Sequence, residues 1–237
     1  MRRMPLRKFA VTGFAWVVVL GAAWPAQAQD AKASYSSMAP LDQYLMTDRN
    51  AEIAMARSAA PEAISRDADV LVLGQHGYET AVKGKNGFVC VVERAWMSPD
   101  DSVDFWNPKM RGPLCFNPPA ARSILPSTIE RTKLAIAGKS KDEIIAANKA
   151  AYDNKQLPPL EPGSMSYMMS KHSCLTANCG NLAHVMIYTP HADPAFWGND
   201  VPNSPIMLNP QFKDIAPIDV WVIGVGKWSD GTPAPVM

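Results

Sequence analysis

The chain lacks any run of basic residues. Its 23 Lys plus Arg are offset by 22 Asp plus Glu, which leaves a formal net charge of +1. Proteins that bind nucleic acid or anionic membrane surfaces carry a basic patch or stripe. The charge pattern therefore excludes these partners, and we expect no nucleic-acid interaction.

The short motifs that define common enzyme classes are also missing. Ser-x-x-Lys and Gly-x-Ser-x-Gly do not occur, which removes the usual serine acyl-transfer signatures. There is no phosphate loop and no His-Glu-x-x-His, and Gly224-Val225-Gly226 lies too near the C-terminus for the helix of a dinucleotide site. We expect no cofactor, although an enzyme built from scattered residues is left open.

The N-terminal apolar run, Phe9–Trp24, is shorter than the ~20 residues that a membrane-spanning helix needs. Four basic residues precede it, and Ala26-Gln27-Ala28 follows it as a small-x-small cleavage site. This order predicts an export signal over residues 1–28, removed from a bacterial protein that is periplasmic or secreted and not stably inserted in the membrane. Arg2-Arg3 leaves a twin-arginine route open beside the ordinary secretory one.

The mature part, residues 29–237, keeps 19 of the 23 basic residues and all 22 acidic ones, a net charge of −3. We expect a flexible leader over 29–39, because these residues are small and polar, and one domain over 40–237. A chain of this length buries on the order of 70% of its unfolded surface. The 47% hydrophobic content and the seven Trp of the full sequence indicate a globular domain.

Four cysteines, Cys90, Cys115, Cys174 and Cys179, lie in the mature part. An even number in an oxidising compartment predicts two disulfides, for which three connectivities are possible. We favour Cys90–Cys115 and Cys174–Cys179, because each pair flanks turn-rich sequence. Redox or zinc chemistry is the weaker interpretation, since four residues separate the last two cysteines and no second paired cluster exists.

The first half of the mature chain predicts helices, a strand and a hairpin. Residues 40–60 predict one or two helices, with Asp48 as a possible N-cap for the second, and residues 70–73 form a short apolar run typical of a buried strand. Residues 78–95 contain two β-prone runs around Asn86-Gly87, the usual signal of a two-residue hairpin. In that register Val82 faces Val91 and Glu79 faces Arg94. Residues 97–119 are predicted to be a connection rich in Pro, Asp and Asn.

The second half predicts two helices followed by strands. Ser127 and Ser140 each begin a capping-box pattern, with helices ending near Gly138 and Asn154. Strands are expected over 165–169, 184–189 and 218–225. Strands before and after a helical insert predict an α+β fold with a largely antiparallel sheet, a central helical insert and a single domain.

Two groups of residues could carry chemistry. Thioethers and imidazoles are soft ligands suited to copper(I), which makes Met165, Met168, Met169 and His172 candidate metal ligands. Strand methionines more often fill core space, however, and adjacent strand residues face opposite sides of a sheet. His184, beside a buried strand, is the candidate catalytic residue, as a general base or ligand-binding group. Its alternative is a structural histidine bound to a backbone carbonyl.

Four segments carry a resemblance to a known group of proteins. They are Gly84–Cys90 (GKNGFVC), Gly112–Phe116 (GPLCF), Pro162–Met168 (PGSMSYM) and His184–Tyr188 (HVMIY). In this order they resemble a group of exported bacterial proteins to which no function is assigned. The resemblance implies that Cys90 and Cys115 belong to a shared framework, and it implies no activity.

Together these features favour an exported binding or structural module. One alternative is a hydrolase-like enzyme that uses His184 with a nearby carboxylate, and another is a copper-binding protein that uses the Met165–His172 segment. The ligand and the oligomeric state are not predicted.

Overall fold

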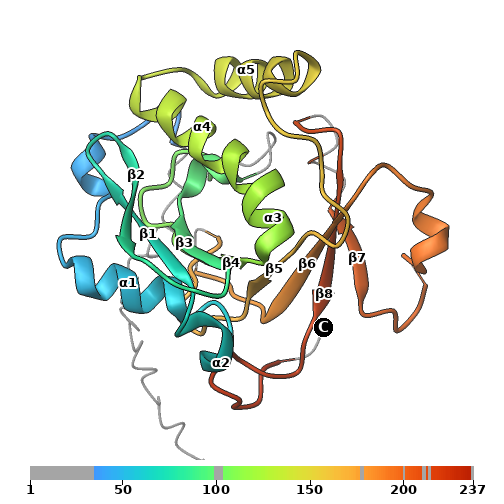
Figure 1. The fold of residues 1–237 in the computed structure, drawn as a ribbon. Helices are drawn as coiled ribbons and strands as arrows, with labels where there is room; N and C mark the ends of the chain where they lie inside the picture. The colour runs from blue at the N-terminus through green and yellow to red at the C-terminus, as the bar shows by residue number, and fades with distance from the viewer. Residues whose placement is uncertain are drawn as a thin grey trace, which may run out of the picture. The chain divides into compact units, whose positions relative to one another are not determined.

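The computed structural model describes residues 35–98, 104–176, 179–199, 201–209, 212 and 215–235. The predicted export signal and residues 29–34 lie outside the described residues. The described part is an α+β domain (Figure 1). Its strands are β1 (Asp69–Gly74), β2 (Gly77–Val82), β3 (Val89–Glu93), β4 (Gly112–Phe116), β5 (Met165–Met168), β6 (His184–Thr189), β7 (Ile206–Asn209) and β8 (Asp219–Gly224). Its helices are α1 (Arg49–Arg57), α2 (Glu62–Ser65), α3 (Pro118–Ser123), α4 (Leu125–Ile136) and α5 (Lys141–Asp153).

The eight strands form one sheet in the order β2-β1-β3-β4-β5-β6-β8-β7. Every neighbouring pair is antiparallel except β1 and β3. Helices α3, α4 and α5 follow β4 and precede β5. The predicted fold class, a largely antiparallel sheet with a helical insert, is therefore confirmed.

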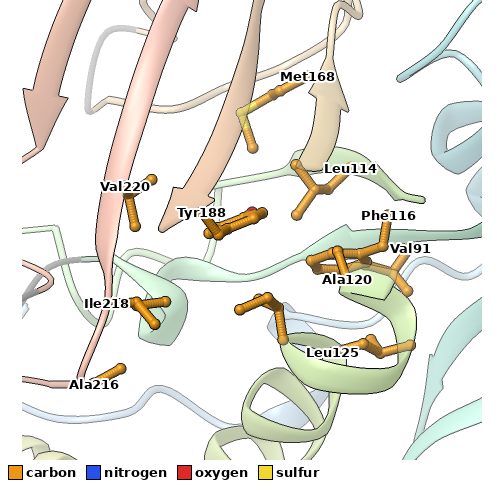
Figure 2. Close-up of a cluster of buried hydrophobic side chains, with 11 residues drawn as sticks. Val91, Leu114, Phe116, Ala120, Leu125, Met168, Tyr188, Ala216, Ile218 and Val220 are labelled. Carbon is orange, nitrogen blue, oxygen red and sulfur yellow. The ribbon is translucent and has the colours of Figure 1, made fainter. Parts of the chain in front are cut away.

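The alternation of side chains along the central strands divides the core between the two faces of the sheet. On one face Cys90, Val92 and Cys115 pack with Ala56 of α1 and with Ala59 and Ala60, which follow that helix. On the other face Val91, Leu114 and Phe116 pack with Ala120 and Leu125 of α3 and α4 (Figure 2). Met168, Tyr188 and Val220 extend this second cluster across β5, β6 and β8.

The predicted hairpin around Asn86-Gly87 is wrong, because β1 lies between β2 and β3. The hairpin is instead formed by β1 and β2, whose last aligned pair is Gly74 and Gly77. The Asn86 amide donates to the Ile64 carbonyl, and the backbone N–H of Lys85 donates to Asp67. The turn is thus hydrogen-bonded to the segment before β1. After this turn, β3 runs parallel to β1 and pairs with it.

The expected Glu79–Arg94 pair is consequently wrong as well. Glu79 forms an exposed ion pair with Arg49 of α1. Arg94 is 2% exposed and donates to Glu52, 1% exposed, at 2.8 Å between Nη2 and Oε1. The same Glu52 oxygen accepts the backbone N–H of Leu73 at 3.1 Å, and Arg94 Nε donates to the Tyr44 carbonyl at 2.8 Å. This buried network joins α1 to β1, to β3 and to the turn at Tyr44.

Two further local expectations differ from the structure. Residues 97–119 contain β4, a central strand that the connection interpretation missed because of Pro113. Ser127 does not cap a helix, since α4 begins at Leu125 and the Ser127 hydroxyl donates to Asn148 of α5. The Ser140 capping box is present with Glu143, and the Asp48 carboxylate accepts the N–H groups that begin α1.

The two favoured disulfides, Cys90–Cys115 and Cys174–Cys179, are both formed. The first joins residues directly opposite each other on β3 and β4. Tyr35 and Met38, which fall within the expected leader, pack against a third core cluster around Trp96 and Trp106. Among the described residues, no helix is long and apolar enough to cross a membrane.

Candidate functional site

A cavity of about 210 Å³ lies over the sheet face that carries Leu114 and Tyr188. We call it the Glu93 cavity. Strand ends bring its walls together, because Glu93 ends β3, Gly112 begins β4, Met168 ends β5 and His184 begins β6. It is lined by Glu93, Arg94, Met97, Ser98, Met110, Gly112, Met168, Leu175, His184, Met186, Asn209 and Val222.

A smaller cavity of about 60 Å³ adjoins it and shares Glu93, Met97 and Met186. This second cavity is lined mostly by the apolar cluster of Figure 2, including Phe116 and Ile218. Tyr188 points into the same cluster, and its hydroxyl is 2.8 Å from the Ser166 hydroxyl. Glu93 therefore lies where the two cavities meet, as the one carboxylate among the described residues that line them.

The environment of Glu93 makes its carboxyl group a weak acid. Burial raises its pKa from the ordinary value of 4.5 to about 7, although a hydrogen bond from Thr128 and the positive charge of Arg131 both act to lower it. Thr128 Oγ1 donates to Oε1 at 3.0 Å, and it is the only described residue that hydrogen-bonds the carboxylate. The remaining accessible surface of Glu93 faces the cavities that it lines. The carboxyl can therefore accept a donor or pair with a positive charge brought in by a ligand.

His184 is 6% exposed and lies against the backbone. Its Nδ1 is 2.8 Å from the Leu182 carbonyl, and because a carbonyl only accepts, Nδ1 carries the proton. Burial lowers the pKa of the imidazole, which favours its neutral form. No described residue hydrogen-bonds Nε2, which is left as a bare acceptor on a ring that lines the Glu93 cavity.

The structure does not bring the Met165–His172 residues into one group. Met165 and Met168 are three positions apart on β5 and so face opposite sides of the sheet. His172 is exposed, whereas Met169 is buried and its backbone N–H donates to Ala59. Of these four, Met168 alone lines the Glu93 cavity. Among the described residues, no group of three or more His, Cys, Asp or Glu is placed to hold a metal ion.

A second histidine, not His184, is hydrogen-bonded to a carboxylate. His191 Nδ1 is 2.9 Å from Asp219 Oδ1, and Asp219 Oδ2 accepts the Ala192 N–H. The pair borders a cavity of about 120 Å³ that Lys149 and Tyr152 also line. The His191 side chain is 53% exposed, and none of the described residues that line that cavity is a serine, threonine or cysteine.

The sequence interpretation missed Glu93, Met97, Met110 and Met186 as site residues. The hairpin interpretation, in which residues 78–95 form a local pair of strands, gave no reason to single out Glu93. An acidic residue directly after the apolar run Val89–Val92 was the available signal, because a strand residue on the core face is seldom charged. The methionines come from separated segments, so only the fold reveals that they meet.

Comparisons with known proteins find no matching family model, no similar curated protein and no similar solved structure.

Proposed function

We propose that this chain is an exported binding protein, of the group that its motifs resemble, and that it holds a small positively charged ligand in the Glu93 cavity. The observation that carries the proposal is the Glu93 carboxyl group, which lines the cavity and which accepts a hydrogen bond from only one described residue, Thr128. The raised pKa of Glu93 indicates that Thr128 and Arg131 offset only part of the cost of burying its charge, and a cationic ligand would offset more of it. The two disulfides and the N-terminal signal pattern support an exported location.

The size of the cavity limits the ligand. An apolar cavity of ~150 Å³ accommodates benzene, so about 210 Å³ suits a ring with one short polar substituent, or a single ion with its ligating side chains. Benzylamine and benzoate are therefore matched probes, because they have a similar size and shape but opposite charges.

The test is a titration followed through the methionine methyl signals of protein labelled at methionine with ¹³C. Benzylamine should shift the signals of Met168 and Met186, which line the cavity, and leave Met207, which is 41% exposed on β7, unchanged. We expect benzylamine to bind at least about tenfold more tightly than benzoate above pH 7, where Glu93 is ionised. Glu93→Gln should remove that preference.

A variant that fills the cavity provides the structural control. A Cβ at Gly112 would lie 3.5 Å from Met168 Cε and 3.8 Å from Glu93 Cβ, so Gly112→Val places methyl groups in the cavity without a close clash at Cβ. Thr80→Val adds a valine on the exposed edge strand β2 instead. Binding should be lost in the first variant and kept in the second. Equal shifts with benzoate, or binding unchanged by Gly112→Val, would overturn the proposal.

An enzyme is the second candidate, because His184 and Glu93 line the same cavity. The bare Nε2 of His184 could act as a general base toward a water molecule. Hydrolysis of small activated esters that disappears in both His184→Gln and Glu93→Gln would favour this function. Turnover that is equal in the two variants and the parent protein would exclude it.

A further inference from the structure

Three soft donor groups occupy neighbouring positions on one face of the sheet. Met168 of β5 is directly opposite His184 of β6, and Met186 is two residues further along β6. Residues opposite each other in antiparallel strands have Cβ atoms roughly 4.5–5.5 Å apart, and diagonal neighbours roughly 7–8 Å. All three side chains line the Glu93 cavity. In Figure 2 the Met168 side chain extends from its strand toward Tyr188.

The imidazole of His184 is oriented as a metal ligand usually is. Metal-binding histidines commonly donate one ring N–H to a backbone carbonyl, which fixes the ring and leaves the other nitrogen to bind the metal. The Nδ1–Leu182 hydrogen bond does this here, and Nε2 carries the free lone pair. Burial keeps the ring neutral, the form that ligates.

The kinds of donor present decide between metal ions. Thioethers and imidazole favour Cu(I), whereas Ca²⁺ and Mg²⁺ need several oxygen ligands. Met97 and Met110 line the same cavity and add two more thioethers, one of which accepts a weak contact from Ser98 Oγ at 3.9 Å. The carboxylate of Glu93 would balance the charge of a monovalent cation. Methionine has three rotatable side-chain bonds, so the thioethers of Met168 and Met186 can converge on Nε2 without a change of the backbone.

We propose that the ligand of the Glu93 cavity is Cu(I), bound by His184 Nε2 and by the thioethers of Met168 and Met186. This inference rests on the proposed function, because it names the cation that the same cavity would hold. It replaces the Met165–His172 segment as the copper site and retains only Met168 from it.

The test is an anaerobic titration of the full protein with Cu(I) in competition with a chromophoric Cu(I) chelator. We expect one equivalent to bind and to shift the methionine methyl signals of Met168 and Met186. Met168→Leu and Met186→Leu keep the side-chain volume nearly unchanged but remove the sulfur. Each should weaken binding by at least about tenfold.

Met165→Leu is the matched control, since Met165 lies on the same strand and faces the other side of the sheet. Affinity that is unchanged in the Met168→Leu/Met186→Leu double variant, or lost equally in Met165→Leu, would overturn the Cu(I) site. If Cu(I) fails to compete with the chelator while benzylamine shifts the same methyl signals, the Cu(I) inference is wrong and the proposed binding function stands. If neither probe binds, both proposals are wrong.

Discussion

The ionisation of Glu93 should make the stability of the protein depend on pH. Its pKa is about 7 in the folded protein and near 4.5 when exposed, so between these values the folded state holds a proton that the unfolded state has lost. Stability therefore falls as the pH rises through this window. The full penalty is present above about pH 7 and is absent below about pH 4.5. The difference between the two pKa values corresponds to about 3 kcal/mol, as an upper value.

Glu93→Gln cannot ionise and can still accept the Thr128 hydrogen bond. We expect it to be more stable than the parent protein by up to about 3 kcal/mol near pH 8 and nearly equal to it near pH 4. Burial lowers the pKa of His184, so the contribution of its neutral form to the stability of the protein is lost as the pH falls. His184 is present in both proteins, and this contribution cancels in the difference between them.

The assay is urea unfolding of both proteins at several pH values, with Glu62→Gln as a control. Glu62 is exposed at the start of α2, so its substitution should change stability little at any pH. A stability difference between Glu93→Gln and the parent protein that does not vary with pH would refute the assignment of Glu93 as a buried weak acid.

Three other predictions concern the framework and the export of the chain. Replacing Cys90 and Cys115 by Ala opens a loop with 24 intervening residues and should lower the free energy of unfolding by about 3–4 kcal/mol, which a lower Tm would show. An unchanged Tm would mean that the disulfide does not stabilise the fold. Glu52→Gln leaves the Arg94 charge buried without its counter-ion and should cost about 3–5 kcal/mol in chemical unfolding, whereas a loss below about 1 kcal/mol would show that water reaches the pair. N-terminal sequencing of periplasmic material should begin at Gln29, and intact Met1 in a membrane fraction would contradict both cleavage and the absence of an anchor.

Local signals in the sequence predicted the elements that short-range chemistry determines. The Ser140 capping box, the Asp48 N-cap and the strand at His184–Thr189 depend on residues within one or two turns of each other, and the structure confirms them. The disulfide pairs were also predicted correctly. The two helix caps and the strand need no knowledge of which strands are neighbours, whereas the Cys90–Cys115 disulfide joins the neighbouring strands β3 and β4.

The order of the strands was not predictable in the same way. Asn86-Gly87 is a strong hairpin signal, but Asp67 and Ile64, which precede β1, bind this turn and allow β1 to insert between β2 and β3. The Pro-, Asp- and Asn-rich composition of residues 97–119 predicted a connection, although β4 lies within it and pairs on both sides. The Glu93 cavity depends on this order, because its walls come from the ends of β3, β4, β5 and β6, and so it could not be inferred from spacing.

The most direct test of the account is a crystal structure of the protein soaked with benzylamine. We predict that the ring lies beside Met168 and Met186 and that the ammonium group lies within hydrogen-bonding distance of the Glu93 carboxylate. A cavity closed by its own side chains, or benzylamine bound elsewhere with the Glu93 cavity empty, would contradict the proposal that this cavity is the ligand-binding site.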